Sequence, residues 1–173
     1  MSKRPPANCR LTIDGNEVEA VVSPHIGQRG FSLWNDALGA RAHFNDLAPG
    51  STSLRDVLQQ QAGKAFVVQL PDKNLGSIDE YRGYAAADMG PHTRRVTSLR
   101  LGLSHDNGRL AFRFEGTAGP VDPGSIFQGA STAVMHSPYR FEIGFEIARD
   151  DLPIYVEDQV ALEAIQTYVE SER

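Results

Sequence analysis

The dipeptide Asn107-Gly108 constrains the fold of this chain more than any other feature, because it lies between two runs of alternating apolar residues. Asn-Gly is typical of a two-residue type I′ turn, in which both central residues need a positive φ. With this turn, Arg100 lies opposite Glu115 as an opposite-charge cross-strand pair. Residues 95–116 are therefore predicted to form a β-hairpin with one apolar, buried face. That face consists of Leu99, Leu101, Leu103, Leu110, Phe112 and Phe114.

Three other segments have the alternating pattern of β-strands. Residues 10–23 predict a second hairpin, whose loop we expect at Gly15-Asn16, and a loop at Asp14-Gly15 gives the same apolar face. In residues 139–147 (YRFEIGFEI), apolar side chains alternate with charged residues or glycine, which predicts a strand with one buried face. Residues 64–70 (KAFVVQL) predict a shorter strand that ends before Pro71.

Helical signals lie between and after these strands. Residues 51–63 begin with a serine cap and end at Gly63, and residues 77–91 begin with Ser77 and Glu80 at capping-box spacing. A helix over residues 33–44, with Ser32 as its cap, is a further prediction. The longest helix is predicted in the C-terminal segment, residues 151–173. Its buried stripe would consist of Ala161, Leu162, Ile165, Tyr168 and Val169.

The order of these elements indicates the fold class. Strands, helices, strands and a last helix follow one another without regular βαβ alternation, and a chain of 173 residues is usually one domain. We therefore predict an α+β fold in which residues 9–173 form a single domain and residues 1–8 form a flexible tail. The fold is a mainly antiparallel sheet, made of two hairpins and further strands. Helices intervene, and a long C-terminal helix packs on the sheet.

Composition and charge exclude several classes of function. The chain is 40% hydrophobic and 23% charged, and it contains no apolar run of the roughly 18 residues that cross a bilayer. It has no apolar leader and one cysteine, Cys9, so we expect a cytoplasmic protein without a disulfide. The net charge of −5 disfavours nucleic acid as a partner. Residues 142–173 hold nine acidic residues and two arginines, a net charge of −7, which favours a basic protein partner.

The candidate binding residues fall into three groups, and none of them has the pattern of a metal, cofactor or nucleophile site. The first is His25, Arg29 and Trp34 in residues 24–36, which we interpret as a strand-to-helix connection or, second, as a recognition loop. In this segment His25 and Arg29 can bind an anion or a carboxylate of a partner. The second is the glycine-rich connection of residues 116–139, either an irregular edge strand or a loop over a pocket. Its polar candidates are Asp122, Ser125 and His136, and the acidic candidates of the third group are Glu157, Asp158 and Glu163.

The absence of a catalytic pattern favours a non-enzymatic binding protein. Its concrete version is an immunity- or antitoxin-like inhibitor that contacts a basic protein partner. One alternative is a ligand-binding domain or enzyme, with an apolar pocket between the sheet and the C-terminal helix. The other is a subunit of a ring- or tube-like homo-oligomer, in which strand edges pair between copies.

Overall fold

The computed structural model describes residues 6–18, 22–27, 31–35, 40–44, 54–61, 63–69, 75–80, 92–121 and 138–171. The strands are β1 (Ala7–Ile13), β2 (Asn16–Val18), β3 (Val22–Ile26), β4 (Phe31–Asn35), β5 (Ala40–Phe44), β6 (Phe66–Gln69), β7 (Gly76–Glu80), β8 (His92–Asp106), β9 (Arg109–Val121) and β10 (Tyr139–Ala148). The helices are α1 (Leu54–Gln61), the 3-10 helix η3 (Arg149–Asp151), α3 (Leu152–Tyr155) and α4 (Gln159–Ser171).

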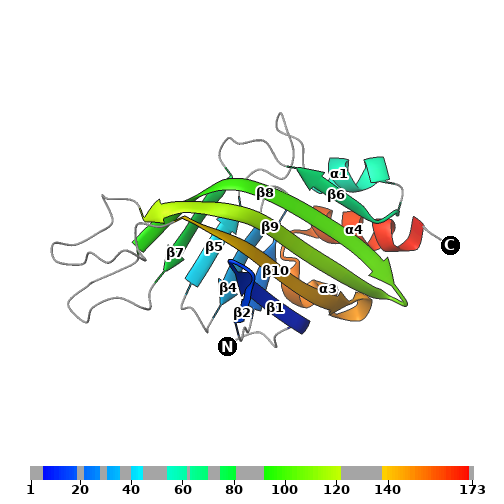
Figure 1. The fold of residues 1–173 in the computed structure, drawn as a ribbon. Coiled ribbons are helices and arrows are strands. Elements are labelled where there is room, and N and C mark those ends of the chain that lie inside the picture. Colours follow the sequence, from blue (N-terminus) through cyan, green and yellow to red (C-terminus); the bar gives the residue numbers. More distant parts are fainter. Residues whose placement is uncertain are drawn as a thin grey trace.

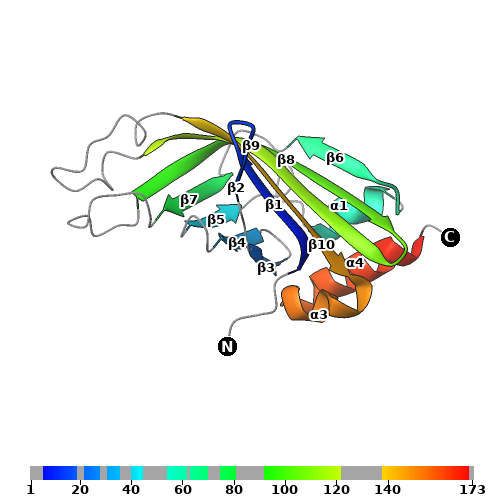
Figure 2. The ribbon, with the colours of Figure 1, turned by 60° about the horizontal axis from the view of Figure 1, so that its bottom comes forward.

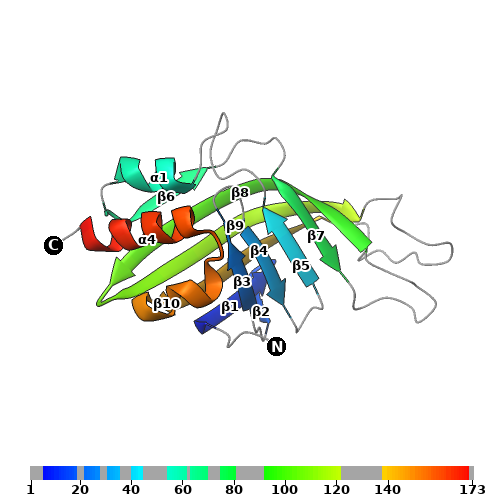
Figure 3. The same ribbon diagram turned by 180° about the vertical axis from the view of Figure 1, so that it is seen from behind.

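The described strands form one antiparallel sheet in the order β2-β1-β10-β9-β8-β7-β5-β4-β3, and β6 pairs with β8 beside this path. The predicted α+β fold with a mainly antiparallel sheet is therefore confirmed. Strands β8, β9 and β10 are long and strongly bent, and the short strands β3, β4 and β5 lie behind them (Figures 1 and 3). The pairing of β8 with β9 shifts register twice between Arg94 and Ser98, and such bulges increase local twist and bending.

The central hairpin has the predicted register. Leu103 pairs with Phe112, and Arg100 pairs with Glu115. Asn107 has a φ of 50° and Gly108 a φ of 76°, as a type I′ turn requires. All six residues of the predicted apolar face are buried, and the inward-facing side chains of β10 extend the same core.

The C-terminal helix packs on the sheet with the predicted stripe. Ala161, Ile165, Tyr168 and Val169 are buried, and Leu162 is partly buried against them. The Tyr168 ring lies edge-on to Phe66 of β6 and to His105 of β8. Helices α3 and α4 therefore cover one end of the long strands (Figure 2), and α1 packs beside α4.

Two predicted helices are wrong where the structure describes them. Within residues 33–44, β4 and β5 form an antiparallel pair in which Leu33 opposes Ala42. Residues 76–80 form β7, which pairs with β5 and β8, so the capping-box spacing of Ser77 and Glu80 does not begin a helix. In both segments, pairing with neighbouring strands outweighs local helical propensity. Residues 81–91 lie outside the described part.

Two boundaries also differ from the predictions. The first hairpin turns at Asp14-Gly15 and not at Gly15-Asn16, since Ile13 pairs with Asn16 and the φ values of Asp14 and Gly15 are 51° and 80°. Asp-Gly is a preferred pair for a type I′ turn, because its second residue is a glycine, which adopts positive φ without steric cost. The predicted connection from residue 116 begins later, because β9 continues to Val121.

The predicted helix in residues 51–63 is confirmed by α1, and the strand in residues 64–70 by β6. No helix among the described residues is long and apolar enough to cross a membrane.

Candidate functional site

The structure describes five of the nine predicted site residues. His25 lies in β3, Trp34 in β4, Glu157 and Asp158 before α4, and Glu163 in α4. The backbone of Trp34 pairs with Ser23 and Arg41 of the neighbouring strands, so this position belongs to a strand and not to a helix. The other four predicted residues, Arg29, Asp122, Ser125 and His136, lie outside the described part of the chain.

His25 and Glu157, which belong to different predicted groups, lie in contact. The Nδ1 atom of His25 is 2.7 Å from Oε1 of Glu157, and both side chains are exposed. Beside them, the amide of Glu157 donates to the carbonyl of Ile26 at 3.3 Å, and Ile26 and Val156 form an isolated bridge. His25 thus contacts a carboxylate of its own chain, and binding of a partner's carboxylate by His25 and Arg29 stays a prediction.

Asp158 and Glu163 have different surroundings. Oδ1 of Asp158 accepts hydrogen bonds from the amides of Val160, at 2.8 Å, and Ala161, at 3.4 Å. This is N-terminal capping of α4, so Asp158 has a structural role. Glu163 is exposed on α4, where Oε1 accepts a hydrogen bond from the side-chain amide of Gln159 at 3.1 Å.

Glu163 lies at a groove between α1 and α4, which we name the helical groove. Its volume is about 520 Å³. It is lined by Arg55, Leu58 and Gln59 of α1 and by Val160, Glu163, Ala164, Thr167 and Tyr168 of α4. Leu58 and Tyr168 are buried, whereas Val160 is 42% exposed, so the groove combines apolar and charged lining.

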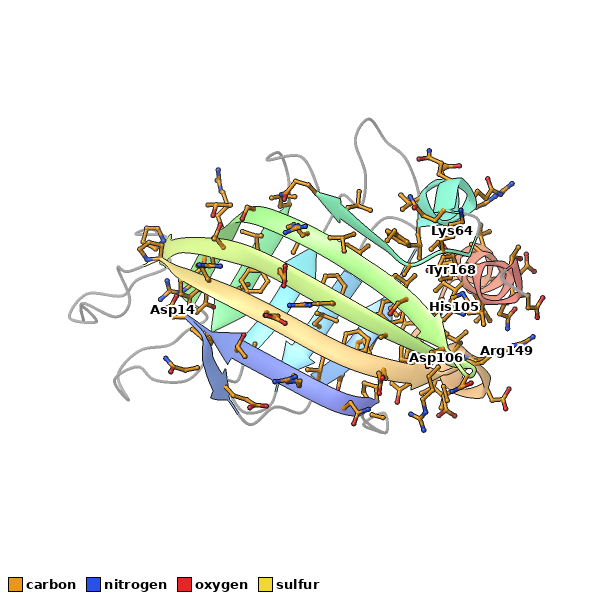
Figure 4. All side chains as sticks on the ribbon, turned by 45° about the vertical axis from the view of Figure 1, so that its right-hand side comes forward. Asp14, Lys64, His105, Asp106, Arg149 and Tyr168 are labelled. Atoms are coloured by element: carbon orange, nitrogen blue, oxygen red, sulfur yellow. The ribbon has the colours of Figure 1, made fainter. Side chains whose placement is uncertain are left out.

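A second hollow, which we name the outer-face groove, lies on the side of the sheet that faces away from the core. Its volume is about 560 Å³, and it crosses β6, β8, β9, β10 and β1. One row of cross-strand neighbours runs through Gln69, Arg100, Glu115, Glu142 and Thr12. The next row runs through Ser98, Thr117 and Arg140 to Asp14, which Figure 4 places at the end of the strands far from Tyr168.

Charges in the first row are paired across the strands. Glu115 and Glu142 lie directly opposite each other, an arrangement that is unfavourable for two like charges. The guanidinium of Arg113 offsets it, because Nη2 lies 2.5 Å from a Glu115 oxygen and 2.8 Å from a Glu142 oxygen. Arg100 is farther from Glu115, at 4.0 Å.

Sequence reasoning missed the outer-face groove as a site. It predicted the Arg100–Glu115 pair and the outward direction of Glu142, but it placed them in separate hairpin and strand patterns. The signal that points to the groove is the succession of polar residues at alternate positions of strands that become neighbours. It can be recognised only when the strand order is known.

Two further residues carry polar groups inside the fold. Arg94 of β8 is buried, donates to the carbonyl of Gly119 at 3.1 Å, and lies 4.7 Å from the centre of the Tyr139 ring. Burial raises the pKa of the Cys9 thiol, which approaches the carbonyl of Pro6 at 3.2 Å. Both residues are therefore held by local structural contacts.

Within the described residues, no group of three or more histidine, cysteine or acidic side chains is arranged to hold a metal ion. Comparison of the chain with family models, curated proteins and solved structures finds no match. The residues of the two grooves are therefore the basis for functional inference.

Proposed function

We propose that this protein binds another protein through the helical groove and does not act as an enzyme. The observation that carries the proposal is the lining of this groove, in which apolar side chains lie between polar ones. Leu58 and Tyr168 belong to its buried part, Val160 is exposed, and Arg55 and Glu163 contribute opposite charges from the two helices. A groove of this kind suits an amphipathic helix, whose apolar face fits between two helices while its polar side chains meet the rims.

A basic partner fits the acidic character of the C-terminal segment, which includes the α4 side of the helical groove. The C-terminal residues 142–173 carry a net charge of −7. Several of these carboxylates already have a cationic partner in the same chain, since Glu142 contacts Arg113 and Glu170 contacts Arg149. Glu163 makes its described hydrogen bond with the neutral Gln159, so it is the carboxylate that we expect to meet a basic side chain of the partner.

The biological role that we propose is inhibition of a basic protein in the cytoplasm, in the manner of an immunity or antitoxin protein. Covering such a partner needs a rigid surface and complementary charge, and it needs no catalytic residues. A homo-oligomer formed through strand edges remains the alternative, because β2 and β3 end the strand path of the described sheet.

The first test is native mass spectrometry of the protein purified gently from its own host. We expect a stoichiometric complex with one other protein, of basic composition. A mass of several identical copies would favour the homo-oligomer instead. Recovery of the chain alone at micromolar concentration would contradict a stable inhibitory complex.

The second test measures affinity for that partner by calorimetry. We expect Glu163→Lys to weaken binding roughly tenfold or more through like-charge repulsion, and Val160→Asp to weaken it through the loss of apolar contact. Glu17→Lys is the matched control, because Glu17 is exposed in β2, outside the lining of the helical groove, and its ion pair is with Arg10, at 3.6 Å. Wild-type affinity in both groove variants would show that the partner binds elsewhere.

A further inference from the structure

The outer-face groove has a lining that suits a polar and extended ligand. Nine of its twelve lining residues have polar side chains, in contrast to the mainly apolar lining of most small-molecule pockets. It crosses five strands, so its length is about 19 Å for four interstrand spacings of about 4.8 Å. The side chains stand on strands of one sheet, which holds their spacing without the ligand.

The lining offers both donors and acceptors. Ser98 and Thr117 share a hydrogen bond of 2.7 Å between their hydroxyl oxygens, and Thr12 adds a third hydroxyl on β1. Glu115 and Glu142 are held by Arg113, and each carboxylate has further acceptor positions beyond these contacts. Such a mixture matches a ligand whose hydroxyl groups donate and accept in turn.

One cation in the groove is available to an anionic group. The Arg140 side chain is exposed, and its guanidinium makes no hydrogen bond or ion pair with any residue that the structure describes. The backbone of Arg140 is held in place, because its amide donates to Oδ1 of Asp14 at 3.0 Å. The guanidinium of Arg100, on the other side of the groove, lies 4.0 Å from the carboxylate of Glu115.

We propose that the outer-face groove binds an acidic oligosaccharide. The acid group pairs with the Arg140 guanidinium, whose planar donors suit two oxygens of a carboxylate or a sulfate. The sugar hydroxyls meet the hydroxyl and carboxylate side chains along the two rows. The groove itself contains arginines and carboxylates together, which disfavours a nucleic-acid backbone with a phosphate at every residue. This site is separate from the helical groove, so the proposal does not depend on the proposed protein partner.

The test is binding of the purified full chain to an array of neutral, carboxylated and sulfated oligosaccharides. We expect retention of acidic members and weaker retention of neutral ones of the same length. The carboxylated and sulfated members identify which anion the groove takes. The strongest acidic oligosaccharide on the array is then titrated by calorimetry with wild type and variants.

In that titration, Arg140→Gln should weaken binding about tenfold or more, since it removes a charge-assisted hydrogen bond, and Arg100→Gln should weaken it less. Arg10→Gln is the matched control, because Arg10 lies on the same face of β1 but outside the groove lining. A blank array, equal retention of neutral members, or unchanged affinity in Arg140→Gln would overturn the proposal. So would a dimer of the chain that Arg140→Glu dissociates, because this face would then be an interface between copies.

Discussion

At the scale of single residues, Gly116 shows how closely the backbones of β8 and β9 approach beside the shifted register. A Cβ atom at this position would overlap the carbonyl oxygen of Ser98 and lie 2.8 Å from Cζ of Phe141. Phe141 is buried, and the strand carbonyl cannot move without disturbing its pairing. The position therefore requires glycine for space, although its φ is not in the left-handed region.

We expect Gly116→Ala to lower the free energy of unfolding by about 1–3 kcal/mol, the usual cost of inserting a methyl group into a filled core. Gly144→Ala is the control, because the nearest atom to a Cβ there is 3.7 Å away. That variant should stay within about 0.5 kcal/mol of wild type. Thermal and urea unfolding followed by circular dichroism compare the two, and equal stabilities would show that the β8 backbone shifts freely.

At the scale of elements, Tyr168 joins α4 to the sheet by two kinds of contact. Its hydroxyl lies 2.8 Å from the carbonyl of Lys64 and 3.4 Å from that of Leu103. Its ring contacts Phe66 and His105. Figure 4 shows Lys64, His105 and Tyr168 together at one end of the long strands. Tyr168 thus helps to fix the position of α4, and with it the helical groove, together with the other buried residues of the α4 stripe.

Two substitutions separate these contacts. Tyr168→Phe keeps the ring and should cost about 1 kcal/mol, because a buried carbonyl loses its donor. Tyr168→Ala should cost about 3–5 kcal/mol, since it also leaves a cavity between helix and sheet. Urea unfolding measures both values. Equal losses in the two variants would mean that the hydroxyl, and not the ring, holds the helix.

At the scale of the whole molecule, the last strand of the sheet path meets the segment between α3 and α4. β3 ends the path, yet Ile26 bridges to Val156, and His25 contacts Glu157. These contacts join the N-terminal strands to the C-terminal helices. The backbone bridge is formed at buried residues, whereas the side-chain pair lies at the surface, with exposed fractions of 43% and 62%.

A double-mutant cycle with His25→Gln and Glu157→Gln should give a coupling energy of no more than about 1 kcal/mol, because exposed ion pairs contribute little. Sodium chloride at about 1 M should reduce the coupling further, since it shortens the screening length to about 3 Å. Chemical denaturation of the four proteins at two salt concentrations provides the measurement. A large, salt-independent coupling energy would contradict this prediction and would indicate that the His25–Glu157 pair is needed to hold β3 against the segment before α4.

The candidate sites differed in how far the sequence could predict them. The contact of Glu157 with His25 joins two residues that were each singled out, but 132 residues separate them, so no spacing rule connects them. The outer-face groove combines residues of five strands, and its composition depends on which strands are neighbours. The function proposed for each groove therefore depends on tertiary structure.

The amino-acid sequence by itself determined the central hairpin, the β10 strand and the buried stripe of α4. In each of these, the spacing of apolar residues repeats over many positions. The turn residues Asn107 and Gly108 add a signal of their own, because they adopt the positive φ that a type I′ turn requires. Only the tertiary structure decided that residues 31–35, 40–44 and 76–80 are strands. A segment of five residues contains too few repeats of the apolar pattern to distinguish a strand from a helix. Their conformation follows from the hydrogen bonds that neighbouring strands of the sheet supply.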